Sequence, residues 1–318
     1  MRTKITVAIP AYNAERWLRE TLDSAFGQTL PAHEIIVVDD GSKDGTEEIA
    51  RSFGDRVRYI KQPNQGVSAA RRTAIREATG DWIAFLDSDD LMAPEKLEKQ
   101  VALIEANPSL VVVYSAFTYL YEDGITSVAP VFPARNLWPA LRYRTPILPS
   151  TSIVRRSALE EIEAFNGWTN TGEDWQLWFC LVRRFGKDAF SDVPESLTFY
   201  RCWENNATKN FRRFANGTLD LLDSLLLEDL TGWRKYLWKR RIEARIYFHI
   251  ALSLRDVKDE RYWEYALESF FKWPLWGAVV PWRRYGVLAH MLYTKLRNFR
   301  MDARYWWPIR NCRQGLIQ

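Results

Sequence analysis

Short apolar runs and amphipathic stretches alternate through the first half of the chain. The apolar runs are rich in β-branched residues, which predicts strands, and the stretches between them repeat at helical spacing. The predicted strands cover residues 5–10, 34–40, 57–60, 82–87 and 110–117, and the predicted helices cover residues 14–27, 45–53, 66–78 and 94–106. Strict alternation of this kind predicts an α/β fold, with a mostly parallel central sheet and helices on both faces.

The pattern weakens after residue 117. Residues 118–150 hold five prolines and show no clear period, which predicts an irregular connection over the sheet. The remaining predicted elements are a strand leading into a helix over residues 151–162, a helix from about Glu173, a strand over residues 196–203, and helices from residue 211 to the end.

Charge divides the chain at about the same place. Residues 1–210 carry 24 Lys and Arg against 29 Asp and Glu, a net charge of −5, whereas residues 211–318 carry 20 against 11, a net charge of +9. Two regions with different partners are therefore expected. We predict one domain over residues 1–210, with halves at about 1–117 and 118–210, and a helical, basic and aromatic C-terminal region over residues 211–318.

The spacing of the cysteines and the hydropathy of the chain indicate where in the cell the protein is expected. Cys180, Cys202 and Cys312 are widely spaced and form no CxxC pair, which is typical of a reducing compartment and gives no structural zinc pattern. The first apolar run has five residues before Pro10, so we interpret it as a strand and not as a signal peptide. No apolar stretch reaches the roughly 20 residues needed to span a bilayer. A cytoplasmic location is expected, with the cytoplasmic face of a membrane as an open alternative.

Polar side chains follow three of the predicted strands directly. Tyr12 and Asn13 follow the first strand, Asp39 and Asp40 end the second, and the turn 87–90 follows the fourth. In open α/β sheets, ligands bind outside the carboxyl ends of the strands. This coincidence predicts a binding site at that edge of the sheet.

The segment DDGSKDGT, residues 39–46, imitates part of a calcium-binding loop. Its twelfth position is Arg51, where such a loop needs a bidentate glutamate, so the calcium interpretation fails. A strand-ending turn with a helix cap explains Ser42 and Asp44 better. For Asp40, a structural role and a contact with a base or ribose are equally plausible.

The turn Asp87-Ser88-Asp89-Asp90 places three carboxylates after an apolar strand. A solvated turn with a helix cap would explain Asp90. Mn²⁺ and Mg²⁺ bind one or two carboxylates together with water and substrate phosphates. Such a cation would remove the repulsion between neighbouring carboxylates, so we predict a divalent metal at this turn.

Other polar residues have structural explanations of similar weight. Glu173 and Asp174 lie at a predicted helix start, where acidic residues are favourable. Arg71 lies on a predicted helix, where an arginine is more often solvated than bound to phosphate. The three histidines show no metal-ligand spacing and are interpreted as structural: His33, His249 and His290.

Taken together, these residues resemble the family 2 inverting glycosyltransferases, which bind nucleotide sugars on the GT-A fold. The resemblance covers roughly residues 4–203, and it rests on five motifs found in the expected order. These are IPAYN (9–13), VVDDGSKDGT (37–46), NQGVSAAR (64–71), GDWIAFLDSDD (80–90) and GEDWQLW (172–178).

The resemblance implies a reaction and a donor. A sugar moves from a nucleotide diphosphate donor, with UDP favoured, to a hydroxyl of a saccharide or a lipid-linked saccharide, and the anomeric centre is inverted. Asp40 is implied to hold the base and Asp87 to face the ribose. The residues implied in nucleotide binding are Pro10, Tyr12, Asn13, Asp40, Arg71, Asp87 and Ser88.

The same resemblance assigns the chemistry to carboxylates. Asp89 is implied to bind Mn²⁺ or Mg²⁺ directly, with Asp87 in the metal shell. Asp174 is implied to be the general base, with Glu173 beside it. Two positions depart from the pattern: Arg72 stands where many relatives have asparagine, and Trp203 stands near where many have a histidine. No histidine is therefore expected to assist the metal.

Two other functions are weighed against this one. A magnesium-dependent phosphotransferase would use Asp87 and Asp89, but it usually needs a nucleophilic aspartate after the first strand, where this chain has PAYN. An inactive, membrane-associated nucleotide-binding scaffold is the second alternative, and the retained acidic residues argue against it.

The last part of the chain is basic and aromatic. Residues 270–310 are interpreted either as a helical cap packed on the catalytic domain or as a peripheral contact with an anionic membrane. Nucleic acid is not expected as a partner, because no groove-reading motif is present and residues 1–210 are net acidic.

Overall fold

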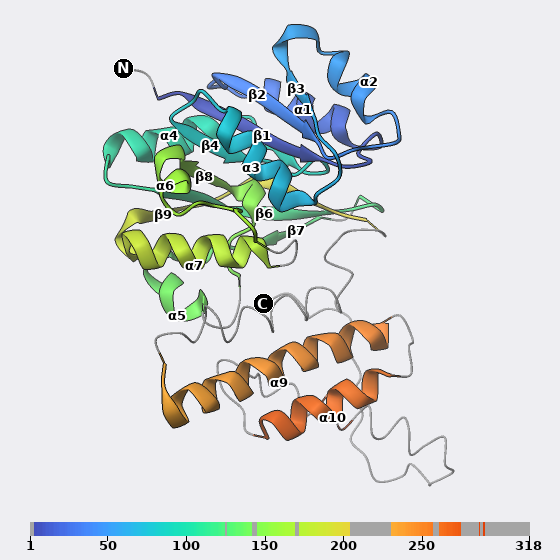
Figure 1. The fold of residues 1–318 in the computed structure, drawn as a ribbon, viewed down its shortest axis with the longest axis vertical. Coiled ribbons are helices and arrows are strands. Elements are labelled where there is room, and N and C mark those ends of the chain that lie inside the picture. Colours follow the sequence, from blue (N-terminus) through green and yellow to red (C-terminus); the bar gives the residue numbers. More distant parts are fainter. Residues whose placement is uncertain are drawn as a thin grey trace. The chain divides into compact units, whose positions relative to one another are not determined.

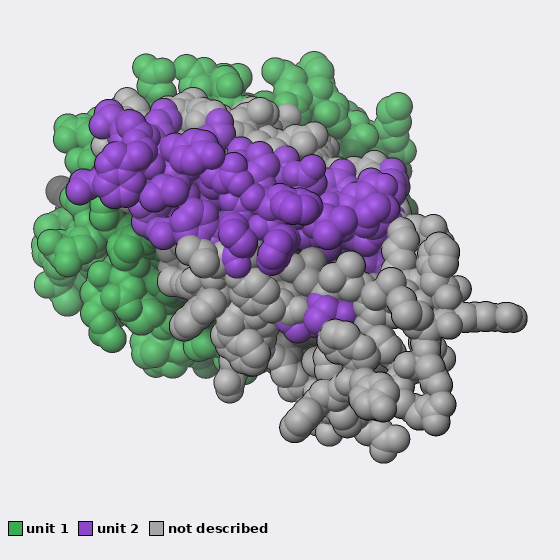
Figure 2. Space-filling model, turned by 90° about the horizontal axis from the view of Figure 1, so that it is seen from below, with its two compact units in different colours: residues 1–206 green, residues 207–318 purple. Residues whose placement is uncertain are grey.

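A computed structural model describes residues 3–124, 126–141, 145–168, 172–203, 230–256 and 261–274, together with residues 286 and 289. Contacts between Cα atoms divide the chain into two compact units, Met1–Asn206 and Ala207–Gln318, which are coloured separately in Figure 2. Each unit is considered by itself below.

The first unit is built on one sheet with helices against it (Figure 1). Its strands are β1 (Ile5–Ala11), β2 (Glu34–Asp39), β3 (Arg58–Lys61), β4 (Trp82–Phe85), β5 (Leu91–Met92), β6 (Val112–Tyr121), β7 (Thr126–Ala129), β8 (Ser152–Arg155) and β9 (Phe190–Cys202). Its helices are α1 (Leu18–Phe26), α2 (Thr46–Arg51), α3 (Val67–Glu77), α4 (Lys96–Ala106), α5 (Leu137–Leu141), α6 (Arg156–Glu161) and α7 (Glu173–Phe185).

The strand order is β3-β2-β1-β4-β8-β6-β9-β5, with β7 paired to β6. The four strands β3, β2, β1 and β4 are parallel to one another. Antiparallel β8 then joins β4 to β6, and β6 pairs with β9 in parallel. The α/β fold with a mostly parallel sheet, predicted from the alternating pattern, is confirmed.

Strand residues alternate between the two faces of the sheet. Val7 and Ile9 of β1 belong to a buried cluster with residues of α1 and α4, such as Leu22 and Val101. The residues between them face the other way, where α3 lies against β1 and β2. Because both faces are covered, the central strands β1 and β4 are buried along their whole length, whereas the edge strand β3 is partly exposed.

Residues 118–150 are more regular than the prolines suggested. β6 continues to Tyr121 and forms a hairpin with β7, and α5 follows. Tyr119 packs edge-on against Phe117 and Tyr200, with ring centroids 4.9 and 6.0 Å away. This aromatic cluster on the sheet extends the strand past the point where the apolar run ends, so the prediction of an irregular connection was wrong for this part.

The second unit contains the described helices α9 (Gly232–Asp256) and α10 (Tyr262–Lys272), which lie side by side (Figure 1). Ala251 and Ala266 are buried between them, and the Ser269 hydroxyl donates to the carbonyl of Ala244 at 2.6 Å. The predicted C-terminal helices are therefore confirmed for these residues. No helix among the described residues is long and apolar enough to cross a membrane.

Candidate functional site

The carboxyl ends of three neighbouring parallel strands meet at one edge of the sheet. Ala11 of β1 is in register with Asp39 of β2, and Ala8 of β1 with Phe85 of β4. The turns that follow these strands are therefore adjacent. Figure 1 shows them on the same side of the sheet as the start of α3. The structure thus brings together the strand-end residues that the sequence singled out.

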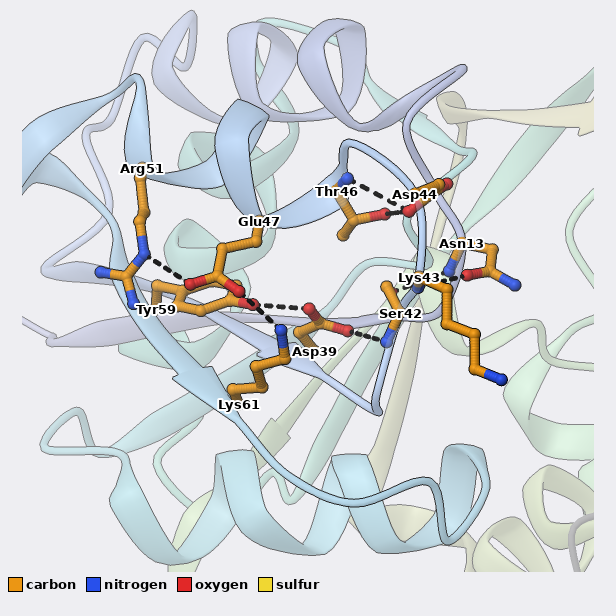
Figure 3. Close-up of polar contacts among 10 residues, drawn as sticks. All are labelled: Asn13, Asp39, Ser42, Lys43, Asp44, Thr46, Glu47, Arg51, Tyr59 and Lys61. Atoms are coloured by element: carbon orange, nitrogen blue, oxygen red, sulfur yellow. Dashed lines mark hydrogen bonds and ion pairs between the residues drawn. The ribbon is translucent and has the colours of Figure 1, made fainter.

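The turn after β2 is held to the turn after β1 by hydrogen bonds (Figure 3). Buried Asp39 accepts bonds from the Ser42 amide at 2.8 Å and the Tyr59 hydroxyl at 2.5 Å. Asn13 has a φ of 49°, its amide donates to the Ser42 hydroxyl at 2.9 Å, and its side-chain oxygen accepts from the Lys43 amide at 3.0 Å. The two turns therefore form one rigid support.

The rest of the 39–46 segment is structural, as its turn chemistry predicted. The Asp44 carboxylate accepts bonds from the amide and the hydroxyl of Thr46, at 3.1 and 2.5 Å, at the start of α2. These bonds lower the pKa of Asp44 against the opposing effect of burial. Tyr12 lies beside this support with 51% of its surface exposed, and Pro10 is buried within β1.

Asp40 organises the loop that leads into α3. Its carboxylate is buried and accepts bonds from Gln62 Nε2 at 2.7 Å, the Gln65 amide at 2.9 Å and the Gly66 amide at 2.6 Å. Gly66 has a φ of 88°, a conformation that glycine adopts most readily. Of the two roles left open for Asp40, the structural one is therefore directly observed.

Arg71 of α3 connects two carboxylates that are far apart in the sequence. The side chain is buried, and its Nη2 lies 2.7 Å from Asp87 Oδ1, while its Nη1 lies 2.9 Å from Glu173 Oε1. Burial alone would lower the pKa of Arg71, but the two carboxylates raise it, so the guanidinium remains charged. The expectation of a solvated arginine was wrong, because burial here is compensated by two ion pairs.

The acidic turn after β4 is fixed by the end of β9. Trp203 Nε1 donates to Asp89 Oδ2 at 2.8 Å, and Arg201 Nε donates to the carbonyl of Asp89 at 2.9 Å. The Arg201 amide also donates to Asp90 Oδ1 at 3.0 Å. No sequence pattern predicts these roles, because a single Arg and a single Trp at a strand end have no distinctive spacing.

The pKa values of Asp89 and Asp90 in this turn are both raised. Burial raises the pKa of Asp89, and the neighbouring Asp87 raises it further, although the Trp203 bond opposes the shift. Asp90 is buried, and burial together with the charges of Asp89 and Asp87 raises its pKa well above the ordinary value. The carbonyl of Ser88 accepts a bond from the Thr21 hydroxyl at 3.0 Å. A cation at this turn would favour the ionised carboxylates.

Glu173 and Asp174 form the first turn of α7, after Gly172 in a left-handed conformation with a φ of 76°. Glu173 is ion-paired to Arg71, as described above. Asp174 Oδ1 accepts a bond from the Trp175 amide at 2.7 Å. Burial, followed by the charge of Glu173, raises the pKa of Asp174 to about 7. Asp174 is therefore a carboxylate able to accept a proton near neutral pH.

The described residues contain no group of three or more His, Cys, Asp or Glu side chains arranged to hold a metal ion by themselves. This is compatible with the cation predicted at the acidic turn, because Mg²⁺ and similar ions often use only one or two carboxylates and take their other ligands from water and phosphates. One carboxylate oxygen of Asp89 accepts a bond from Trp203, and one carboxylate oxygen of Asp87 accepts a bond from Arg71. The other oxygen of each carboxylate fits the role of a metal ligand.

Comparison with known proteins gives a consistent result. The sequence profile described as "Glycosyl transferase family 2" matches residues 6–163. EpsE of Bacillus subtilis (strain 168), provisionally named a glycosyltransferase, is 31% identical over 66% of this chain and 77% of its own length. TuaG of the same organism, provisionally named a teichuronic acid biosynthesis glycosyltransferase, is 28% identical over 67% of this chain and 85% of its own length.

Other relatives are longer than this chain. An uncharacterized glycosyltransferase of Rickettsia felis is 33% identical over 56% of this chain, but the match spans only 31% of that protein. Among solved structures, S. aureus TarS 1–349 in complex with UDP-GlcNAc has a TM-score of 0.60 and 18% identity, covering 93% of this chain and 89% of that one. At this identity the likeness concerns the fold.

Proposed function

Because the chain belongs to glycosyltransferase family 2 and has its GT-A fold, we propose that it moves a sugar from a nucleotide diphosphate donor to an acceptor hydroxyl with inversion of the anomeric centre. One observation carries this proposal: Arg71 pairs with Asp87 in the turn after β4 and with Glu173 at the start of α7, and the charges of Arg71 and Asp87 act on Asp174. This arrangement supports a donor site at Asp87 and a proton acceptor at Asp174 within one site.

Asp174 is the proposed general base. An acceptor hydroxyl is a very weak acid, so its proton must be removed while its oxygen attacks the anomeric carbon. The bond from acceptor oxygen to anomeric carbon forms, the bond from that carbon to the phosphate oxygen breaks, and the nucleoside diphosphate leaves. Glu173 is a positioning residue in this scheme, because its carboxylate is bound to Arg71.

Mn²⁺ or Mg²⁺ is the proposed cofactor. Asp89 would hold it directly and Asp87 would support it, since both present hard oxygen ligands. When bound, the metal neutralises negative charge on the leaving diphosphate. Trp203 and Arg201 keep the Asp89 side chain and backbone in place for this role.

A UDP-sugar is the favoured donor. The TarS structures in complex with UDP and UDP-GlcNAc support this choice through the shared fold. Pro10, Tyr12 and Asn13 would form the base-binding loop with Asp40. Although the Asp40 carboxylate accepts three bonds from the protein, two oxygens have about four acceptor positions, so it can accept one more. Arg71, Asp87 and Ser88 would lie nearer the ribose and phosphates.

A saccharide or lipid-linked saccharide is the proposed acceptor, and the cytoplasm is the proposed location. The name of TuaG, which refers to teichuronic acid biosynthesis, supports a role in polysaccharide assembly. The sequence pattern leaves open a peripheral contact of residues 270–310 with an anionic membrane. Of this range, residues 275–285, 287–288 and 290–310 lie outside the described residues, so this contact stays a prediction.

A donor screen tests this proposal. The protein is incubated with Mn²⁺ and each of several UDP-, GDP- and dTDP-sugars, and release of nucleoside diphosphate is measured with and without saccharide acceptors. Release from one donor, increased by an acceptor, is expected. Release of inorganic phosphate instead would support the phosphotransferase alternative, and release of neither product from any donor would support an inactive scaffold.

A further inference from the structure

Exposed aromatic rings gather at one end of the α9–α10 hairpin. Among the described residues, large hydrophobic side chains are exposed at five positions, and three of these are Trp233 at 69%, Tyr236 at 58% and Phe271 at 67%. Trp233 and Tyr236 are three residues apart on α9 and therefore share a face. We name these three residues the aromatic tip.

Arg240 joins the two helices at this end. Its Nη1 donates to the Tyr236 hydroxyl at 3.1 Å, and its Nε donates to the carbonyl of Lys272 at 2.8 Å. The last turn of α10, with Phe271, therefore lies beside the first turns of α9. The aromatic tip therefore combines exposed rings from both helices at the same end of the pair.

Basic side chains surround the aromatic tip. The guanidinium of Arg234 lies over the Trp233 ring, 5.6 Å from its centroid, and that of Arg240 lies at the same distance from Tyr236. Glu243 is buried and paired with Lys272 at 2.9 Å. Among the residues of α9 and α10 whose exposure is described, the exposed carboxylates are Glu264 and Glu268. The basic residues in this part of α9 are Arg234, Lys235, Lys239, Arg240, Arg241 and Arg245.

This combination fits the surface of an anionic bilayer. Trp and Tyr are enriched at membrane–water interfaces, where the ring is half-buried and its polar atom is hydrated. Arginine and lysine near the surface of an anionic membrane contribute attraction at the depth of the lipid phosphates. An exposed apolar surface that lies next to basic groups therefore fits an anionic lipid bilayer as its partner.

We propose that the aromatic tip docks on an anionic lipid bilayer, with Trp233, Tyr236 and Phe271 entering the headgroup layer and the basic side chains of α9 contacting lipid phosphates. This surface lies in the described residues 230–256 and 261–274 and does not depend on the proposed sugar transfer. It would hold the protein at the surface of a membrane.

Vesicle co-sedimentation of the full chain tests the proposal. Vesicles of phosphatidylcholine alone and of phosphatidylcholine with phosphatidylglycerol are compared at about 0.1 M NaCl, where charges are screened beyond about 10 Å. Binding only to the vesicles that contain phosphatidylglycerol is expected. Replacing Trp233, Tyr236 and Phe271 together by serine should weaken binding at least about tenfold, since three interfacial rings are lost.

A charge variant separates electrostatic attraction from ring insertion. Arg234→Glu should weaken binding at least about fivefold, because each basic residue contributes roughly 1 kcal/mol at an anionic surface. Arg76→Glu is the matched control, since Arg76 is an exposed arginine of α3 in the first unit, and its binding should equal that of the parent. Circular dichroism confirms that each variant is folded.

Several results would overturn the proposal. One is the absence of sedimentation with anionic vesicles, and another is equal binding to neutral vesicles. Parental binding by the triple serine variant or by Arg234→Glu would also reject this surface. If light scattering shows that the parent forms dimers that the triple serine variant lacks, the aromatic tip is a contact between two copies of the chain and not a membrane surface.

Discussion

Two adjacent acids at the start of α7 have different environments. Glu173 is 13% exposed at its side chain and is ion-paired with the buried Arg71. Asp174 has its pKa raised to about 7, first by burial and then by the charge of Glu173. Neighbours that differ in this way can divide positioning and proton transfer between them.

Asp174→Asn should separate catalysis from structure. Asparagine has a similar shape, and its side-chain oxygen can still accept the Trp175 amide that Asp174 accepts in the parent. We expect unchanged nucleotide and metal binding by calorimetry, with sugar transfer slower by at least about a hundredfold, the usual effect of losing a general base. Transfer at the parental rate would mean that another group accepts the proton.

The rate of transfer should depend on pH through Asp174. Only the deprotonated carboxylate accepts a proton, so kcat is expected to rise with pH up to about 7 and then level off. In Glu173→Gln the neighbouring charge is gone, the pKa of Asp174 falls, and the rising limb should move to lower pH. A pH profile that stays in place in Glu173→Gln would contradict this electrostatic coupling.

Asp89→Ala should remove metal-dependent activity without unfolding the protein. Asp89 lies at a turn on the sheet edge and is not part of the apolar core, so its loss should change the thermal midpoint little. Transfer by the parent should likewise stop in excess chelator and recover with Mn²⁺. Asp81→Ala is the matched control, because Asp81 is exposed at the opposite end of β4. Full activity of the parent in chelator would remove the metal from the mechanism.

At the scale of elements, α3 and β9 hold the site together from outside the strand ends. α3 supplies Arg71, which binds the turn after β4 and the start of α7. β9 supplies Arg201, and Trp203 follows this strand directly; both bind the same turn. The turn is therefore held in two ways: Arg71 pairs with the carboxylate of Asp87, and Trp203 and Arg201 donate hydrogen bonds to Asp89.

Arg71→Ala should destabilise the first unit. Removing the buried guanidinium leaves the carboxylates of Asp87 and Glu173 without their counter-ion, and breaking a buried ion pair in this way usually costs about 3–5 kcal/mol. Arg72→Ala, the next residue on α3, removes an exposed bond to Asn166 and should change the free energy of unfolding by less than about 0.5 kcal/mol. Chemical denaturation measures both, and equal effects would contradict the structural role of Arg71.

Sequence pattern predicted the strands and helices of the nucleotide half well, because β-branched runs and helical spacing are local signals. The pattern also predicted a metal site at Asp87 and Asp89, whereas the family resemblance implied Asp174 as the general base, and the structure brings Asp87 and Asp174 near the same arginine. It could not predict the partner of Arg71, since Glu173 is 102 residues away and no local pattern records such a distance. Trp203 was noted only as a departure from the family pattern, and its bond to Asp89 depends on the pairing of β5 with β9.

At the scale of the whole molecule, a buried lysine affects the stability of the first unit. Lys96 is fully buried at the start of α4, and within the described part of the chain its Nζ has no hydrogen-bond partner. Burial lowers the pKa of Lys96 to about 7. The folded chain therefore binds this proton less tightly than the unfolded chain does.

The free energy of unfolding should consequently rise with pH above about 7. Between that value and the ordinary lysine pKa of 10.5, the unfolded state keeps a proton that the folded state has released, and stability increases wherever the unfolded state binds more protons. Lys96→Met has a similar length without the charge, so it should be more stable at pH 6 to 7 and lose much of this pH dependence. Identical slopes for parent and variant in urea denaturation would contradict the assignment.

The double ion pair of Arg71 also constrains how this chain can change over generations. A substitution at Glu173 leaves the buried guanidinium with one counter-ion, and a substitution at Arg71 leaves two carboxylates facing each other. Neither intermediate is neutral, so a lineage that alters one position is under selection to alter the other. Positions 71 and 173 are therefore expected to be inherited as a matched pair, although 102 residues separate them.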